Sequence, residues 1–450
     1  MIRKADKGNT VIITYTSEYN KEVNNFINSN NFIQDIGNTT CRLQRDIRST
    51  INECQYFIPK EDRWKYINVN PTTPTIRGLI KIHKAEAPIR PIINWENAPA
   101  YKIAKTLAKI LNIHIPLHCA YNVKSFTQLI NDMQVIKYNR NLRLASFDVT
   151  NMYTNVSSNE LLGIIDTICQ NNNIDRNIKT DITRLSEAII NQNYFQFMDQ
   201  TYMQIEGLAM GAPTSSILSE IYLQFLEKNR IYNILTKHIK GYFRYVDDIL
   251  TVYDVHQSNI EDVLLEFNKL APKLKFAIEK EEKQKINFLD LTIHRKRSRF
   301  SIDIYRKPTT TDTIIANDFC HPREQKMAAI HNLHNRMMTY DVSPENRQNE
   351  RHNIQLILRN NKYIPSIIKD MKHKKEDRVQ EEKIKWEKFT YIGRETRFIT
   401  KAFKNTKVRI TFTTDNTIKT FLLHGRSSIE INMTNLEYTN WSVHHVIRNI

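Results

Sequence analysis

The stretch Gly241-Tyr242-Phe243-Arg244-Tyr245-Val246-Asp247-Asp248-Ile249-Leu250-Thr251-Val252-Tyr253 consists of two short apolar runs around a pair of adjacent aspartates. Runs rich in Tyr, Phe, Val and Ile are typical of strands, and a polar break of two residues indicates a hairpin. We therefore expect a β-hairpin with Asp247 and Asp248 at its tip. Adjacent carboxylates repel each other and have low β-propensity, and a hard cation such as Mg²⁺ would offset that cost. For a Val-Asp-Asp motif alone, an exposed acidic turn is the simpler interpretation.

A third carboxylate lies upstream. The apolar run from Leu142 to Val149 predicts a short strand, with Asp148 near its end. On neighbouring strands, Asp148 and Asp247 would clamp two Mg²⁺ ions, with Mn²⁺ as a substitute. Two metal ions stabilise both the attacking and the leaving oxygen in phosphoryl transfer. Tyr153 follows at a spacing that would place its ring beside the sugar of an incoming nucleotide.

A glycine-rich stretch, Gly207 to Tyr222, separates these acids. The chain has only nine glycines, and two of them, Gly207 and Gly211, lie within five residues. The Ser and Thr residues that follow are expected to cap a helix. A backbone without side chains lets a base pair approach closely, which makes Gly211 a candidate nucleotide contact.

The order Phe-Asp, Gly-x-x-x-Gly-x-Pro-x-Ser, Tyr-Val-Asp-Asp resembles the palm of reverse transcriptases. Within that group it is most similar to Penelope-like elements, which are related to telomerase-type reverse transcriptases. The further matching motifs are Lys4-Ala5-Asp6-Lys7-Gly8-Asn9, Gly78-Leu79-Ile80-Lys81-Ile82-His83-Lys84, Pro88-Ile89-Arg90-Pro91-Ile92, Phe288-Leu289-Asp290-Leu291 and Tyr305-Arg306-Lys307-Pro308-Thr309-Thr310-Thr311-Asp312. The resemblance runs from residue 4 to about residue 425, and its specificity comes from the set rather than from one motif.

The resemblance implies an α+β fold of the right-hand polymerase type, with fingers, a palm built from an antiparallel sheet with helices, and a helical thumb. Residues 1–140 would form the N-terminal region and fingers, and 141–310 the palm with the catalytic motifs. Residues 311–388 would form the thumb, and 389–450 a connector and tail. The family usually has more chain before residue 4 and a C-terminal GIY-YIG nuclease. We expect a shortened copy without that nuclease, because no Gly-Ile-Tyr precedes Tyr391-Ile392-Gly393.

The implied function is that of an RNA-directed DNA polymerase of a retroelement, which extends a DNA primer with dNTPs on an RNA template. Asp148 and Asp247 would ligate both Mg²⁺ ions, and Asp248 would support them as a third catalytic and metal-binding acid. The implied nucleotide contacts are Lys81, Arg90, Tyr153 and Gly211, and the implied primer and template contacts are Phe288, Leu289, Arg295 and Arg297.

Several alternatives remain open at this point. Lys81, Lys84 and Arg90 also fit a generic basic hairpin, and the turn Arg295 to Arg299 also fits a solvated tip. Many reverse transcriptases have Pro-Gln where this chain has Ala209-Met210. The chain would then be either an active polymerase or an inactive, truncated copy that binds nucleic acid. An RNA-templated RNA polymerase is a further alternative, against which Tyr153 argues.

The formal net charge of +17 favours a nucleic-acid partner. Five cysteines without a Cys-x-x-Cys pair indicate a reducing, intracellular compartment, and the resemblance implies the nucleus. No run is long enough to span a membrane. Cys320, His321, His331 and His334 match no zinc-ligand spacing.

Periodicity predicts the remaining elements. The expected helices are 101–112, 123–138, a helix through Cys169 opened by a Ser157–Glu160 capping box, 178–191, 217–230, 260–270, 322–340, 343–359 and 366–388. The expected strands are 10–14, two in 71–95, two in 194–205 around an Asp199-Gln200 turn, 274–278, 286–293, 300–305, 408–412 and 417–423. Residues 371–385 form a run of mixed charges, which is typical of a solvated helix face or a linker.

Overall fold

The computed structural model describes residues 1–413 except 8–9, 31, 36, 83–86, 118–120, 271–272, 309, 341, 369–370 and 372–384. The described residues form two compact units, one of 1–301 with 305–309 and one of 302–304 with 310–413. The structure is mixed α+β, which confirms the predicted class. Lys84, most of the 371–385 charge run, the 417–423 strand and the tail beyond residue 413 lie outside the described residues.

The first unit holds most of the elements. Its helices are α1 (Thr16–Ser29), α2 (Thr39–Glu53), α3 (Arg63–Tyr66), α4 (Tyr101–His114), α5 (Phe126–Val135), α6 (Met152–Asn155), α7 (Ser158–Asn171), α8 (Arg176–Ile190), α9 (Ser215–Leu226), α10 (Tyr232–His238) and α11 (Ile260–Leu270), with a 3₁₀ turn η1 (Lys60–Asp62) and a π-helical segment η2 (Glu227–Ile231). Its strands are β1 (Ile2–Lys4), β2 (Val11–Ile13), β3 (Ile33–Asp35), β4 (Thr75–Ile80), β5 (Ile89–Asn94), β6 (Leu142–Thr150), β7 (Tyr194–Phe197), β8 (Gln200–Met203), β9 (Ile239–Tyr245), β10 (Asp248–Asp254), β11 (Lys275–Lys280), β12 (Lys285–Phe288) and β13 (Leu291–Arg295), and β14 (Phe300–Ile304) runs from this unit into the second.

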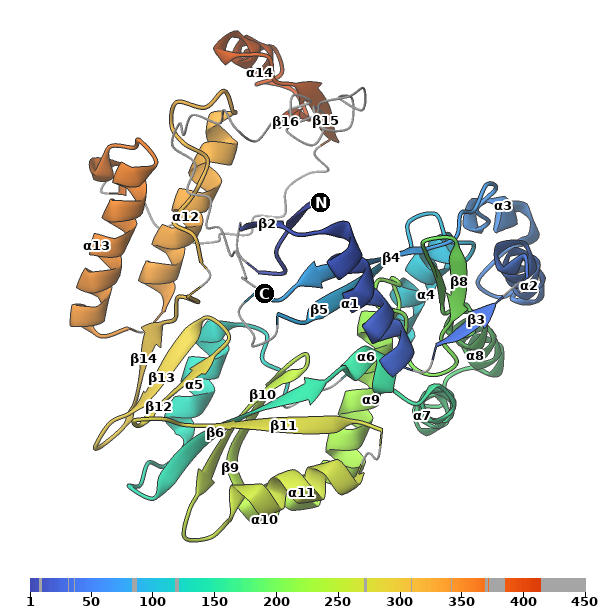
Figure 1. Ribbon diagram of the computed structural model, residues 1–450, viewed down its shortest axis with the longest axis horizontal. Coiled ribbons are helices and arrows are strands. Elements are labelled where there is room, and N and C mark those ends of the chain that lie inside the picture. The colour runs from blue at the N-terminus through green and yellow to red at the C-terminus, as the bar shows by residue number, and fades with distance from the viewer. Residues whose placement is uncertain are drawn as a thin grey trace. The chain divides into compact units, whose positions relative to one another are not determined.

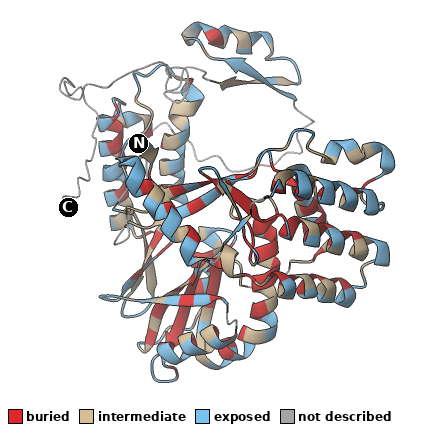
Figure 2. Ribbon diagram, turned by 45° about the vertical axis from the view of Figure 1, so that its right-hand side comes forward, coloured by how far each residue is buried: buried red, intermediate tan, exposed pale blue. Residues whose placement is uncertain are grey.

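A four-stranded antiparallel sheet in the order β11-β6-β10-β9 carries the aspartates (Figure 1). One face is apolar and packs against helices α9 and α11. Phe267 of α11 lies 5.3 Å from the ring of Phe147 and 5.5 Å from that of Phe276, centroid to centroid. Figure 2 shows that buried residues gather on these strands and on the helices against them. This packing holds β6 and β10 in register, because a slip of one residue would expose the apolar face.

A five-stranded sheet in the order β3-β8-β7-β4-β5 is the second large sheet of this unit. All its pairs are antiparallel except β4 with β7, which meet in parallel at Thr75 and Gln196. Helix α1 anchors it, because the Tyr19 hydroxyl accepts a hydrogen bond of 2.7 Å from the backbone of Gly78. β4 and β5 are the two strands predicted within residues 71–95.

The second unit contains α12 (Arg323–Thr339) and α13 (Pro344–Asn360), the two predicted long helices. They share a small core of buried apolar side chains, which consists of Ile330, Met337, Ile354, Leu358, Tyr363 and Ile368. The unit also contains η3 (Pro365–Ile368), η4 (Arg394–Arg397), α14 (Phe398–Ala402) and the parallel strand pair β15 (Lys385–Thr390) and β16 (Val408–Thr413).

Four predictions about local structure were wrong. The 366–388 helix does not extend to its predicted end, where β15 begins. Residues 286–293 form two strands rather than one, because Leu289 adopts a left-handed φ of 55° and the chain reverses there. The predicted helix 123–138 is shorter, and Ser125 caps it by accepting from the backbone N–H of Gln128. The Asp199-Gln200 turn is shifted by one residue to Met198-Asp199.

Helix capping also departs from prediction. Ser157 makes no side-chain cap, and the carboxylate of Glu160, the other half of the predicted capping box, is engaged by Arg230 and the Tyr222 hydroxyl. Thr214 does not cap α9 either, and Ser215 donates to the Ala209 carbonyl at 2.6 Å. Glu160 thus bonds to residues distant in the chain, and Ser215 bonds to Ala209, earlier in the glycine-rich stretch, so neither place follows the predicted capping pattern.

Candidate active site

The aspartates lie on a tight hairpin between β9 and β10, as predicted. Tyr245 pairs with Asp248, so that Val246 and Asp247 form the turn and Asp248 begins β10. The predicted break at Asp247-Asp248 is therefore shifted by one residue. Val246 has a φ of 56°, a left-handed conformation that costs an L-residue about 1–2 kcal/mol. The turn thus holds a strained valine directly before the first acid.

Asp148 of β6 stands opposite Asp248 of β10 in the antiparallel ladder. Residues opposite each other project on the same face, with Cβ atoms about 4.5–5.5 Å apart. The backbone N–H of Val149 donates to the carbonyl of Asp247 at 3.2 Å, which draws the turn to the same strand end. The three predicted acids therefore meet at one edge of the sheet, each only partly exposed.

The carboxylates are crowded together here, so that the negative charge of one disfavours the ionisation of another. Burial raises the pKa of Asp248 to about 6, and the negative charges of Asp247 and Asp148 add to that rise. Burial also raises the pKa of Asp247, with the charge of Asp148 contributing. Like charges held this close disfavour ionisation, so the fold places the acids here at a cost that a bound cation would remove.

The donor set fits a hard divalent cation. Within the described part of the chain, no group of three or more His, Cys, Asp or Glu side chains forms a ready-made metal site. Mg²⁺, however, is usually held by one or two carboxylates together with substrate phosphates and water. The opposed pair Asp148 and Asp248, with Asp247 beside it, matches that requirement.

Three cations, Arg90, Lys7 and Lys307, lie near enough to the acids for their charges to act on the pKa values of Asp247 and Asp248. Arg90 of β5 is held by Asp6, whose carboxylate lies 3.1 Å from the guanidinium and whose side chain is 1% exposed. Burial still raises both pKa values, but the charges of Arg90 and Lys7 oppose the rise for Asp247, and those of Lys7 and Lys307 oppose it for Asp248. Burial lowers the pKa of Lys7, and the charges of Lys307 and Arg90 lower it further. The cations are thus close enough to repel one another and to attract a polyanion.

Lys7 and Lys307 were missed as site residues in the sequence analysis, although both belong to motifs that carry the resemblance. The backbone N–H of Asp6 donates to the carbonyl of Ile80 at 3.0 Å, which joins the first motif to the end of β4. Lys81 follows β4, and its N–H closes the β4–β5 hairpin on the Pro88 carbonyl at 2.9 Å. Lys81 contacting the nucleotide stays a prediction.

The glycine-rich stretch packs against the strand that carries Arg90. The backbone N–H of Ile93 donates to the Met210 carbonyl at 2.9 Å. Gly211 has a φ of 120°, and a Cβ there would lie 2.1 Å from the Ile93 carbonyl oxygen. Glycine at this position is therefore required by the fold itself, and a nucleotide contact at Gly211 stays a prediction.

Tyr153 belongs to α6, directly after the Asp148 strand, and its ring packs partly against the main core. Burial raises the pKa of its hydroxyl, the charge of Asp247 adds to the rise, and a hydrogen bond with Ser219 opposes it. The ring is therefore near Asp247 and partly accessible, as a residue that senses the nucleotide sugar would need to be.

The predicted primer and template contacts are differently placed. Phe288 is buried, and Leu289 forms the β12–β13 turn. Arg295 lies in β13 rather than in the basic turn, and its guanidinium pairs with Glu281 at 2.8 Å. Arg297 is exposed between β13 and β14. Of the two arginines, Arg297 alone belongs to the solvent-facing loop.

A protein-family profile matches part of the second unit. The profile of the animal helix-turn-helix domain matches residues 313–373, which include α12 and α13. No curated protein sequence matches the chain. None of the helices in the described ranges is long and apolar enough to cross a membrane.

Comparison with solved structures finds telomerases. Telomerase from Candida albicans, in complex with a TWJ fragment of telomeric RNA, has a TM-score of 0.52 and 12% identity over 80% of this chain and 62% of that one. The corresponding Candida tropicalis complex has a TM-score of 0.48 and 14% identity over 80% and 59% of the two chains. The chain thus spans about three-fifths of the length of these telomerases. The similarity to the Candida albicans structure shows a shared, telomerase-like fold.

Proposed function

We propose that the chain is an RNA-directed DNA polymerase of a Penelope-like retroelement, which extends a DNA primer with dNTPs on an RNA template. The observation that carries the proposal is the meeting of Asp148, Asp247 and Asp248 at one sheet edge, opposite Arg90, Lys7 and Lys307. Acids beside clustered cations suit a reaction in which a triphosphate is both bound and cleaved. The telomerase-like fold supports the same class.

In this proposal the four-stranded sheet is the palm, and the β4–β5 hairpin belongs to the fingers. Asp148 and Asp247 would hold Mg²⁺ with support from Asp248, and the metal would neutralise charge on the attacking and leaving oxygens. Arg90, fixed by Asp6, would bind the triphosphate through its planar guanidinium, and Lys7 and Lys307 would add point charges. Tyr153 would orient the sugar. The protein thus contributes positioning and charge neutralisation.

A second candidate is a nucleic-acid-binding protein without catalysis. It is favoured by the lack of a ready-made metal group of three side chains among the described residues. The same charge of +17 would serve it. Both candidates require an affinity for primer–template that falls steeply with salt, because counterions are released on binding.

Primer extension by the purified full chain separates the two candidates. RNA and DNA templates are compared with dNTPs and Mg²⁺, and Asp247→Asn and Asp148→Asn serve as variants. We expect extension on the RNA template. In either variant the extension rate should fall by more than the roughly 100-fold that is lost when a residue hydrogen-bonded to a metal ligand is replaced. Salt-sensitive binding without extension, or extension that survives both substitutions, would reject the proposed polymerase.

A further inference from the structure

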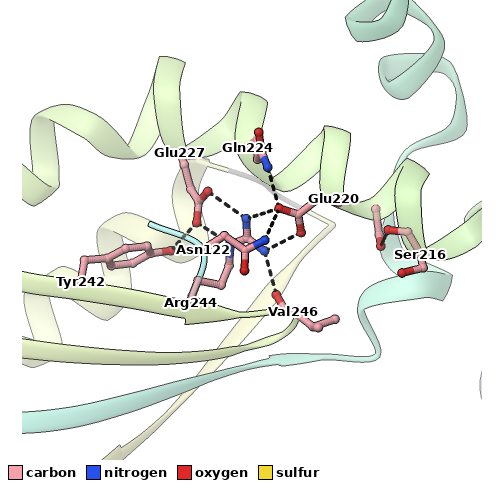
Figure 3. Close-up of polar contacts among 9 residues, drawn as sticks. Asn122, Ser216, Glu220, Gln224, Glu227, Tyr242, Arg244 and Val246 are labelled. Atoms are coloured by element: carbon pink, nitrogen blue, oxygen red, sulfur yellow. Dashed lines mark hydrogen bonds and ion pairs between the residues drawn. The ribbon is translucent and has the colours of Figure 1, made fainter. Parts of the chain in front are cut away.

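Arg244 has a fully buried side chain that makes two ion pairs (Figure 3). Its Nη1 and Nη2 donate to the Glu220 carboxylate at 2.8 and 2.9 Å. Its Nε and Nη2 donate to Glu227 at 2.6 and 3.1 Å. A buried charge of this kind persists only when its hydrogen bonds are well satisfied. The arrangement therefore fixes the guanidinium in one orientation.

The same guanidinium reaches the acid turn. Its Nη1 also donates to the carbonyl of Val246 at 3.2 Å, the residue whose φ is 56°. The backbone of Arg244 is fixed as well: its N–H donates to Tyr121, and its carbonyl accepts from Val123, both at 2.8 Å. Arg244, two residues before Val246, thus holds the backbone of this strained residue in the turn.

The carboxylates that hold Arg244 come from the helix after the glycine-rich stretch. Glu220 lies in α9, and Glu227 begins the π-helical segment that follows it. Gln224 and Asn122 donate to Glu220 at 2.7 and 3.0 Å, and the Tyr242 hydroxyl donates to Glu227 at 3.1 Å. Burial alone would raise the pKa of Glu220, but hydrogen bonds and charge from Arg244 lower it. The carboxylate is therefore held ionised against the guanidinium.

We propose that Arg244 is a positioning residue for the metal-binding acids, which it serves by holding Val246 in the left-handed conformation that sets the direction of Asp247. This inference rests on the proposed function, because it assumes that the acids bind a divalent cation. A β-branched residue rarely adopts such a φ, whereas glycine adopts it freely. If Arg244 acts through the turn, then a glycine at position 246 should replace part of its action.

The test is Mn²⁺ binding by the full chain, measured by electron paramagnetic resonance without nucleic acid, together with thermal unfolding. Arg244→Lys, Val246→Gly and the double variant are compared with the unsubstituted chain. Arg230→Lys is the matched control, because Arg230 lies in the same π-helical segment as Glu227 and also pairs with a carboxylate, that of Glu160 in α7. Met198→Gly controls for glycine, since Met198 has a φ of 53° in the β7–β8 turn.

We expect Arg244→Lys to weaken Mn²⁺ binding about tenfold, as the loss of a residue that orients a metal ligand does. Arg230→Lys should leave Mn²⁺ binding unchanged. Val246→Gly should recover at least half of the lost affinity in the Arg244→Lys background, whereas Met198→Gly should recover none. If Arg244→Lys does not fold, Glu220→Gln takes its place, since it preserves the shape of the network and one ion pair.

Unchanged Mn²⁺ affinity in the folded variant, or no recovery by Val246→Gly, would overturn the inference while leaving the proposed polymerase intact. A chain whose Mn²⁺ binding is absent, or does not depend on Asp247, would overturn the metal site of the proposed function and the inference with it.

Discussion

Asp148 and Asp248 face each other across the β6–β10 ladder, at one end of the two central strands of a sheet whose opposite face is packed with aromatic and aliphatic side chains. Phe147 and Ile249, their neighbours in sequence, are buried against the helices. Because side chains alternate along a strand, burying Phe147 and Ile249 turns both aspartates to the other face. The apolar packing of the sheet thus sets the position of the acids.

Removing one charge from this edge should stabilise the fold near neutral pH. The pKa of Asp248 in the folded chain is about 6, above the ordinary 3.8. Between these values the folded state holds a proton that the unfolded state has released, so stability falls as the pH rises through this window. Asp248→Asn should therefore raise the Tm above about pH 6 and confer no gain below about pH 4.

Thermal unfolding across this pH range, with a chelator present, checks that expectation. Asp199→Asn is the control, because Asp199 is an exposed residue in the two-residue turn of the β7–β8 hairpin. The idea of carboxylate crowding would be abandoned if Asp248→Asn lowered the Tm at neutral pH, or if both variants behaved alike.

Gly211→Ala should destabilise the chain strongly. The new Cβ would lie 2.1 Å from the Ile93 carbonyl oxygen at a φ of 120°, and the strained conformation alone costs about 1–3 kcal/mol. Gly163→Ala provides the opposite case, because nothing lies within 4 Å of a Cβ there and a helical Gly→Ala change gains about 0.5–1 kcal/mol. Chemical denaturation measures both, and a Gly211→Ala chain as stable as the original would contradict the close approach of β5.

Tyr153 is predicted to discriminate between sugars. Its ring lies near Asp247 and packs only partly into the core, so it could occupy the space that a 2′-hydroxyl needs. Tyr153→Ala should raise rNTP incorporation relative to dNTP incorporation, while Tyr153→Phe keeps the ring and should preserve the ratio. Single-nucleotide extension gives the ratio directly. An equal ratio in all three proteins would make Tyr153 a core aromatic only.

Lys7 is predicted to bind the triphosphate. A hydrogen bond to a charged group contributes about 1.5–3 kcal/mol, so Lys7→Gln should raise the KM for dNTPs by roughly ten- to a hundredfold. Lys237→Gln is the control. Lys237 is exposed at the end of α10, just before β9 begins, whereas the acid turn follows the other end of β9. Steady-state extension at varied dNTP tests this, and equal KM values for the two variants would remove Lys7 from the site.

Much of the site could be predicted from local pattern. The apolar runs in 142–149 and 241–253 indicate a strand and a hairpin that carry the acids, and the structure places them side by side. Of the three cations near the acids, only Arg90 was predicted. Lys7 and Lys307 are 300 positions apart and belong to no shared periodic pattern, so only the folded chain brings them together. The same holds for Glu160, whose local capping role was displaced by Arg230.

By itself, the sequence determined the α+β class, the strands that carry the acids and the glycine-rich turn between them, because these depend on residues close together in the chain. The tertiary structure decided which face the acids share, which cations oppose them and why Gly211 must be glycine. It also decided the role of Arg244, a residue in an ordinary strand pattern whose carboxylate partners lie 24 and 17 positions away. Charges act through space rather than along the chain, so their partners become visible only once long-range packing has closed around them.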